Sequence, residues 1–268
     1  VRFDELQDII PDEQLSSNDN FNLVYSGVMG SRDGLGYLIR AIHHVVQDFD
    51  STKANFGVIS DHPELVDLNY VSGNGSADWI HANSVAYNPE LDQVMINSRN
   101  FSEFWVIDHS TTSAEAASHA GGNSGKGGDL LYRWGNPEIY GRGTSNDKQL
   151  FGAHDAHWIE AGKPDAGKIM VFNNGHGRPA GNYSTIEVID PPVDGNGNYT
   201  LVGTSAFGPA APDWSYTETP NPDVFSNNIS GAQRQPNGNT LICEGAWGRI
   251  FEVDIRGTTL WEYINPIS

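Results

Sequence analysis

The residues best suited to chemistry are two histidines that begin similar stretches of sequence, His81 and His154. Asn83 follows His81 by two positions, Arg99 follows the next apolar run, and His157 lies three residues after His154. A neutral imidazole is a competent nucleophile and proton carrier near pH 7, and arginine and asparagine supply hydrogen-bond donors. A single histidine in such a place is most often structural. Two at equivalent positions, accompanied by Asn83 and Arg99, favour a functional site.

Metal binding is the first alternative for these histidines. The spacing of His154 and His157 suits zinc on a helix, but this segment is predicted as the end of a strand, where positions three apart face opposite sides. No cysteine pair and no His-Glu-x-x-His motif supports zinc. The loop from Asp194 is rich in Asp and Asn, but its twelfth position is Ser205 and not the glutamate of a calcium loop. A solvated hairpin turn is therefore expected there.

The motifs of nucleotide and hydrolase sites are missing from the sequence. It contains no Gly-x-x-x-x-Gly-Lys-Ser/Thr loop, no strand-linked Gly-x-Gly-x-x-Gly and no Gly-x-Ser-x-Gly elbow. The glycine-rich run 121–128 lies between two predicted strands with no helix after it, and is expected to be a flexible loop. The sequence therefore predicts no nucleotide cofactor, no metal and no serine nucleophile.

The elements that must position the histidines come from an internal repeat with three copies. Each copy holds four short predicted strands, separated by turns rich in Gly, Asn and Pro. With His81, His154 and Ser230 as markers, the copies are spaced by 73 and 76 residues. The predicted strands span 79–87, 93–96, 103–108 and 130–137 in the first copy, 152–159, 168–172, 185–190 and 199–202 in the second, and 230–234, 240–243, 250–254 and 260–266 in the third.

Four-stranded antiparallel units in tandem predict an all-β fold, a β-propeller of about three to four blades. A β-sandwich is the alternative, but the four strand positions match in order in every copy. We expect one propeller domain, with blades at 79–151, 152–229 and 230–268 and an irregular segment with a partial blade at 1–78. The first strand of a blade is the innermost. His81, Asn83, His154 and His157 are therefore expected to converge at one mouth of the central channel.

Three blades do not close a ring, because propellers have about four to eight. Residues 1–78 supply at most one more sheet, and the apolar stretch Tyr37–Phe49 is either a short helix or a strand. Loops at 110–129 and 206–228 account for the length beyond a usual blade of about 40–50 residues. The expected ring is incomplete, and its open edges favour pairing between copies as a homo-oligomer.

Charge and composition exclude several classes of protein. Fifteen Lys and Arg against 34 Asp and Glu give the 268-residue chain a formal charge of −19, so no nucleic-acid partner is expected. No apolar run approaches the length of a membrane span, and the 10% of aromatic residues excludes disorder. An acidic composition with five lysines favours a periplasmic or extracellular location. The single cysteine, Cys243, lies in an apolar run and is expected to be buried.

Several segments together resemble the bacterial arylsulfotransferase (aryl-sulfate sulfotransferase) family. They include Asp78-Trp-Ile-His-Ala-Asn-Ser84, Tyr87-Asn-Pro-Glu-Leu-Asp-Gln93, Ser98-Arg-Asn-Phe-Ser-Glu103, Val106-Ile-Asp-His109, Gly152-Ala-His-Asp-Ala-His-Trp158 and the run 230–243. The resemblance covers about residues 45–266. It implies a six-bladed β-propeller that transfers a sulfuryl group from an aryl sulfate to a phenol, with no nucleotide sulfate donor. It also implies His154 as the nucleophile of a sulfohistidine intermediate, and His81, Asn83 and Arg99 as the residues that hold the sulfate oxygens.

The residue types agree with this implied chemistry. Sulfuryl transfer, like phosphoryl transfer, depends on positioning and on positive donors around the equatorial oxygens. Arg99 offers a planar fork of donors, and Asn83 and protonated His81 add more. His81 is also the candidate that protonates the leaving phenolate. Asp155 or a backbone carbonyl is expected to fix the tautomer of His154.

The sequence departs from the family pattern at both ends. Upstream of His81, the pair His43 and His44 lacks the turn that follows the first strand of the later copies, and no further blade follows the third copy. Two functions are therefore carried forward. One is a ping-pong sulfotransferase that acts on a small aryl sulfate and a phenol. The other is a non-catalytic secreted module that binds or self-assembles through its open edges.

Overall fold

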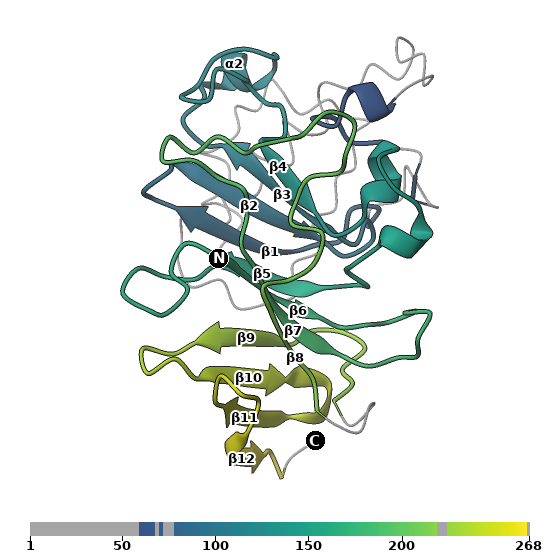
Figure 1. The fold of residues 1–268 in the computed structure, drawn as a ribbon, viewed down its shortest axis with the longest axis vertical. Helices are drawn as coiled ribbons and strands as arrows, with labels where there is room; N and C mark the ends of the chain where they lie inside the picture. The colour runs from purple at the N-terminus through teal and green to yellow at the C-terminus, as the bar shows by residue number, and fades with distance from the viewer. Residues whose placement is uncertain (1–58, 68–69, 72–77, 219–223, 267–268) are drawn as a thin grey trace, which may run out of the picture.

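The computed structural model describes residues 59–67, 70–71, 78–218 and 224–266. The expected helix or strand at Tyr37–Phe49, and the pair His43 and His44, lie outside these residues. The described chain consists of short strands joined by turns and loops (Figure 1). No described helix is long and apolar enough to cross a membrane.

The strands form three four-stranded antiparallel sheets, each in simple chain order. The first sheet holds β1 (Ala82–Asn88), β2 (Gln93–Ser98), β3 (Glu103–Asp108) and β4 (Tyr132–Trp134). The second holds β5 (His154–Trp158), β6 (Ile169–Asn173), β7 (Thr185–Ile189) and β8 (Trp214–Tyr216). The third holds β9 (Gly231–Arg234), β10 (Thr240–Glu244), β11 (Arg249–Val253) and β12 (Thr259–Ile264). The prediction of an all-β chain built from four-stranded antiparallel blades is confirmed.

Helices are few and short among the described residues. Helix α2 (Ser113–Ala116) interrupts the long loop between β3 and β4, where Thr112 and Glu115 form a capping box. The remaining turns of helix are η3 (Ile59–Asp61), η4 (Pro137–Tyr140), η5 (Ser145–Asp147) and η6 (Gly245–Trp247).

The middle sheet separates two hydrophobic cores. Side chains alternate along a strand, so β6 points Ile169 and Val171 into the core shared with the first sheet, and Met170 and Phe172 into the core shared with the third. All five residues of β6 are buried, which explains its continuous apolar sequence. Burying each large apolar side chain contributes about 1.5–3 kcal/mol, so this packing holds the three sheets in series.

Hydrogen bonds between innermost strands link successive sheets. The Ser84 hydroxyl of β1 accepts from the backbone N–H of Ala156 in β5 at 3.0 Å. The Asp155 carboxylate of β5 accepts from the backbone N–H of Ala232 in β9, also at 3.0 Å. These contacts place β5 between β1 and β9, as Figure 1 shows. The innermost strands therefore bring the starts of the sheets together.

The fourth strand of the second sheet is not where the repeat predicted it. That strand was expected at Tyr199–Val202, whereas Trp214–Tyr216 pairs with β7. Tyr199 is buried against the first sheet: its ring stacks on Tyr132 at 4.7 Å, and its hydroxyl donates to Gln93 Oε1 at 2.9 Å. In the sequence, a buried loop aromatic that packs on a neighbouring sheet looks the same as a buried aromatic of a strand. The loop predicted at 206–228 consequently contains β8.

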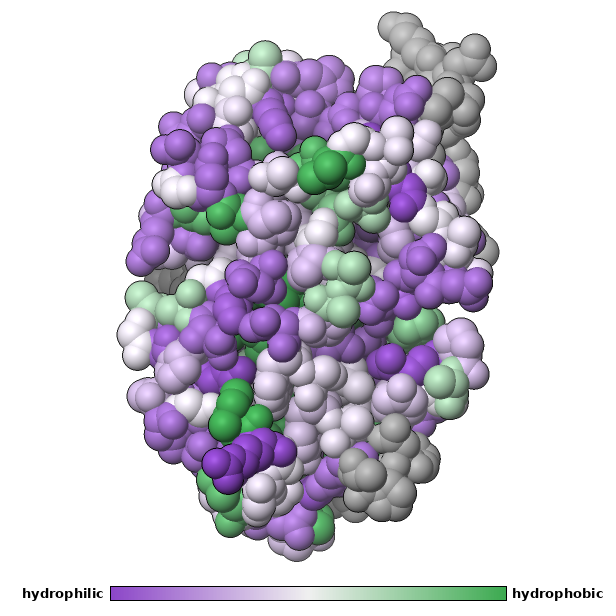
Figure 2. All heavy atoms as spheres, in the orientation of Figure 1, coloured by the Kyte–Doolittle hydropathy of each residue, from purple (hydrophilic) through white to green (hydrophobic). Residues whose placement is uncertain are grey.

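Cys243 is exposed, so the prediction of a buried thiol was wrong. The buried residues of β10 are Thr240, Ile242 and Glu244, and strand alternation places Cys243 on the other face. The expected turn at Asp194 is confirmed: its carboxylate accepts from the backbone N–H groups of Asn196 and Asn198, at 2.8 and 2.9 Å. Polar residues cover most of the face seen in Figure 2, in keeping with the composition.

Candidate functional site

His154 is the first residue of β5, and β5 packs against β1. Its side chain is buried, with the residue only 7% exposed. Nδ1 lies 2.8 Å from the side-chain oxygen Oδ1 of Asn174 and 3.2 Å from the carbonyl oxygen of Gly152. Both neighbours are oxygens, so Nδ1 is held inside the protein by two acceptors.

The electrostatic environment of His154 favours the neutral imidazole. Burial lowers the pKa of His154 to about 4, and the positive charges of Arg99 and His81 act in the same direction. The hydrogen bond to Asn174 opposes the shift without cancelling it. A neutral imidazole at pH 7 retains a lone pair, which is what a nucleophile requires.

His81 lies at the equivalent place, directly before β1. Its backbone has φ +48°, a left-handed conformation that is uncommon for a residue with a side chain and that turns the chain at the entrance to the strand. Its Nδ1 lies 2.7 Å from Asp78 Oδ2. The imidazole is about one third exposed, so part of the ring faces solvent.

Arg99 directly follows β2 and lies beside both histidines. Its backbone N–H donates to the carbonyl of His81 at 3.1 Å, and its charge acts on His154. Gly152 has φ +66°, and a Cβ there would come 3.8 Å from Arg99 Nε, so the guanidinium passes close to the backbone before His154. Among the described residues, no carboxylate lies within ion-pair distance of this guanidinium. In contrast, Arg133, Arg234 and Arg249 are each paired.

Asn83 contacts the backbone beside His154. Its Nδ2 donates to the Ala153 carbonyl at 2.9 Å, and Asn97 Nδ2 donates to the same carbonyl at 2.6 Å. Asn97 also donates to Asn83 Oδ1 at 2.6 Å. The two amides together fix the peptide that precedes the histidine. Asn83 thus lies at the site, with its amide engaged by the protein.

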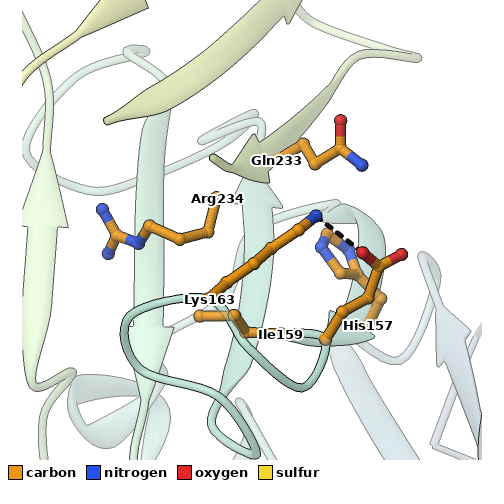
Figure 3. A pocket seen from close by; sticks show the side chains of 6 residues that line it. His157, Ile159, Lys163, Gln233 and Arg234 are labelled. Carbon is orange, nitrogen blue, oxygen red and sulfur yellow. Dashed lines mark ion pairs between the residues drawn. The ribbon is translucent and has the colours of Figure 1, made fainter. Parts of the chain in front are cut away.

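His157 belongs to a different group of side chains. It lines a cavity of about 20 Å³, room for about one water, together with residues of the β5–β6 turn and of β9: Ile159, Glu160, Lys163, Gln233 and Arg234. In Figure 3 the guanidinium of Arg234 points away from His157, and Lys163 forms an ion pair with Glu160 at 2.7 Å. Burial lowers the pKa of His157, but the Asp155 carboxylate and carbonyl outweigh it, so the net shift is upward. The structure does not bring His157 to His154 and Arg99.

Asp155 does not fix the tautomer of His154. Its carboxylate bonds the backbone of β9 and lies 3.6 Å from His157 Nδ1. The backbone carbonyl that was the other expectation is present, at Gly152, but the shorter contact is with Asn174. Sequence reasoning missed Asn174, although a signal was available: Asn174 directly follows the second strand of its sheet, as Arg99 does in the first.

The loop after β6 brings a further histidine to this region. Gly175 has φ +74°, and a Cβ on it would lie 1.7 Å from the Tyr183 carbonyl oxygen, so only glycine fits. Its N–H donates to the Phe151 carbonyl at 2.9 Å. The Cβ of His176 lies 3.9 Å from where a Cβ of Gly152 would stand. No group of three or more His, Cys, Asp or Glu that could hold a metal ion occurs among the described residues.

The site therefore combines a buried neutral histidine, an arginine that forms no ion pair with the described part of the chain, and a second histidine that is paired with a carboxylate. A family model described as Arylsulfotransferase (ASST) matches residues 49–257, well over half of the chain. This chain belongs to the arylsulfotransferase family, as the sequence segments had indicated.

Solved structures show only a distant likeness. A protein of unknown function from Bacteroides caccae is 15% identical, with a TM-score of 0.36, and the match covers 68% of this chain and 45% of that one. BamB from Moraxella catarrhalis is 16% identical, with a TM-score of 0.32, and the match covers 68% of this chain and 37% of that one. The chain thus spans less than half the length of either structure. No curated protein matches it.

Proposed function

We propose that this protein transfers a sulfuryl group from an aryl sulfate to a phenol through a covalent intermediate on His154, without a nucleotide sulfate donor. The observation that carries the proposal is a buried, neutral His154 beside Arg99, whose guanidinium has no carboxylate within ion-pair distance among the described residues. A buried neutral imidazole has a free lone pair and is a nucleophile. An arginine that is not paired with a carboxylate can bind an anion. The family membership supports the same reaction.

In the first half-reaction, Nε2 of His154 attacks the sulfur of the aryl sulfate. The new N–S bond forms as the bond between sulfur and the aryl oxygen breaks, and the electron pair of that bond leaves with the phenolate. Arg99 stabilises the charge on the equatorial sulfate oxygens. His81, held by Asp78 at 2.7 Å, gives its proton to the leaving oxygen.

In the second half-reaction, a phenolic acceptor takes the place of the first phenol. His81 now accepts the proton of the acceptor hydroxyl, whose oxygen attacks the sulfur. The N–S bond breaks, its electron pair returns to Nε2, and His154 is neutral again. The proton given up in the first step is thereby recovered, and the cycle balances without a cofactor.

The test is turnover of p-nitrophenyl sulfate with phenol as acceptor. Wild-type protein is expected to release nitrophenol and to form phenyl sulfate, while His154→Ala does neither. His157→Ala is a matched control, because it removes a histidine of the same strand that lines the other cavity. Its activity should stay close to wild type. Absence of nitrophenol release by the wild type would contradict the proposal.

A second candidate function is self-association of a secreted, non-catalytic module. It is favoured by the third sheet, where all of β12 is exposed, including the large apolar side chains Leu260, Trp261, Tyr263 and Ile264. An exposed apolar edge strand pairs readily with another chain. Sedimentation of wild type against Trp261→Lys separates the two: dimers that the lysine disperses, together with no sulfuryl transfer, would favour this second function.

A further inference from the structure

The histidines of this chain differ in what their Nδ1 atoms contact. Of nine histidines, His43 and His44 lie outside the described residues, which leaves seven. In five of these, a carboxylate oxygen lies 2.6–3.6 Å from Nδ1: His62, His81, His109, His119 and His157. At His154 the side chain in that position is instead an amide, that of Asn174. His154 is the most buried of these histidines, and in a protein with 34 carboxylates its neutral partner needs an explanation.

The surroundings of Asn174 fix which way its amide points. Asn174 is fully buried, and its Nδ2 donates to the backbone carbonyls of Ser226 and Ile229 at 2.8 and 2.9 Å. Turning the amide over would aim its oxygen at two other oxygens. Oδ1 must therefore face His154, where it acts only as an acceptor.

An acceptor at Oδ1 determines where the proton of His154 lies. Oδ1 and the Gly152 carbonyl both accept, so the single proton of the neutral ring is on Nδ1 and the lone pair is on Nε2. We infer that Asn174 is a positioning residue: its oxygen orients His154 and holds the proton on Nδ1, and its lack of charge leaves the imidazole neutral. This inference rests on the proposed function for its meaning, because only a nucleophile needs both properties.

The chemical reason for an amide is the strength of the alternative. A carboxylate at hydrogen-bond distance favours the protonated ring and raises the pKa of a histidine, typically by 1–3 units. The other charged groups that face His154 are Arg99, after β2, and His81, before β1, and both disfavour its protonation. His176 lies beside Gly152 in the loop after β6. An aspartate at position 174 would instead favour the protonated ring of His154, against the effect of Arg99 and His81.

The contacts of Asn174 also tie the nucleophile to the next sheet. Ser226 and Ile229 belong to the segment that enters β9, and both Val224 and Ser226 are fully buried. Ser184 Oγ donates to the Asn174 carbonyl and accepts from the Ser226 N–H. Asn174 therefore links the orientation of His154 to the segment that leads into the third sheet.

The test is ¹⁵N NMR of the histidine side chains in the full-length protein, with His154 assigned through His154→Gln. In wild type we expect the proton on Nδ1, bare Nε2, and titration near pH 4. Asn174→Asp should raise that pKa by 1–3 units and move the acid limb of any sulfuryl transfer by the same amount. Asn173→Ser is the matched control: Asn173 is equally buried but bonds Phe151 and Gln149, so His154 should titrate as in wild type.

Where Asn174→Asp does not fold, Asn174→Ser answers the same question. It is neutral and too short to reach Nδ1, which keeps only the longer contact to the Gly152 carbonyl, so we expect a smaller share of the tautomer with the proton on Nδ1 and no rise in pKa. A wild-type proton on Nε2, an unchanged pKa in Asn174→Asp, or an unchanged tautomer in Asn174→Ser would overturn the inference. The predicted NMR result without any sulfuryl transfer supports the role of Asn174 in holding the proton, and contradicts the proposed reaction instead.

Discussion

At the scale of single residues, chemistry depends on whether a polar group has a partner. Arg99 and His154 have the same residue types as the paired Arg133 and His157, and the sequence does not distinguish them. What differs is burial and neighbouring charge. Residue type and repeat position singled out His81, Arg99 and His154 as candidates, and the structure places Arg99 beside both histidines. The hydrogen-bond partner of each histidine nitrogen depends on the paths of loops, and these paths leave no periodic pattern in the sequence. Asn174 was missed for this reason.

The first prediction concerns the acidity of His154. Its folded-state pKa lies below the ordinary value of about 6.5, so the folded protein resists protonation. The stability contributed by the neutral ring is lost as pH falls from about 6.5 toward 4. The nucleophile, however, stays neutral until about pH 4. The acid limb of kcat/KM in the wild type should therefore lie near pH 4, and a limb already near 6.5 would contradict the assigned environment.

The second prediction separates the roles of His81 and Arg99. If His81 protonates the leaving oxygen, His81→Ala should slow transfer from phenyl sulfate by about 10²–10⁴-fold, and transfer from p-nitrophenyl sulfate far less, because nitrophenolate leaves without a proton. Arg99→Ala should slow both donors alike, since it acts on the sulfate oxygens. The values of kcat/KM for the two donors give the answer, because in a reaction with two half-reactions they report on the first one alone and not on the proton that His81 later accepts. An equal loss for both donors in His81→Ala would show that His81 does not act as an acid.

At the scale of elements, the apolar runs of the three-copy repeat located most of the strands and misplaced one. The buried strands β2, β3, β6 and β7 lie where their continuous apolar runs predicted them. The run at 199–202 has the same character, but Tyr199 packs on the first sheet. A short apolar run indicates that a segment is buried. Which strand that segment pairs with depends on the tertiary arrangement.

The third prediction concerns Glu187, a fully buried residue of β7. Oε1 accepts from Asn173 and Thr185, but Oε2 has no hydrogen-bond partner among the described residues. Burial raises the pKa of Glu187, so the folded state favours the protonated form and stability falls as pH rises above the ordinary value of about 4.5. Glu187→Gln should gain about 1–2 kcal/mol of unfolding free energy at pH 8 and little at pH 4.

Denaturant unfolding at the two pH values checks this prediction. Glu90→Gln, at an exposed turn position, serves as the control and should change stability by less than about 0.5 kcal/mol at either pH. A loss of stability at pH 8 in Glu187→Gln would mean that the charged carboxylate stabilises β7.

At the scale of the whole molecule, the three sheets act as one unit because two apolar cores join them and a few polar side chains bond across them. The repeat predicted three sheets in series and the convergence of their first strands. It did not predict that the site is assembled by cross-sheet contacts, such as those of Asn83 and Asn174. The charge of −19 also acquires a local meaning: Arg99 places a positive group beside His154 in a strongly acidic protein.

The fourth prediction concerns the contact between the second and third sheets. Asp155 has φ +57°, which glycine and asparagine adopt easily. Asp155→Gly removes the bond to Ala232 without straining the backbone, and should cost about 1–3 kcal/mol. Asp155→Asn keeps an acceptor and should recover most of that loss. Hydrogen exchange should show β9 opening earlier in the glycine variant; equal protection in all three proteins would mean that apolar packing alone joins the sheets.

The central claim is that His154 carries the sulfuryl group. Its most direct test is mass spectrometry at neutral pH of protein mixed with p-nitrophenyl sulfate and no acceptor. If His154 carries the group, we expect one added sulfuryl group per chain, located on the peptide that contains His154. This group should be lost when phenol is added and should never form in His154→Ala. A modified peptide without His154, or turnover with no modified protein at any time, would contradict it.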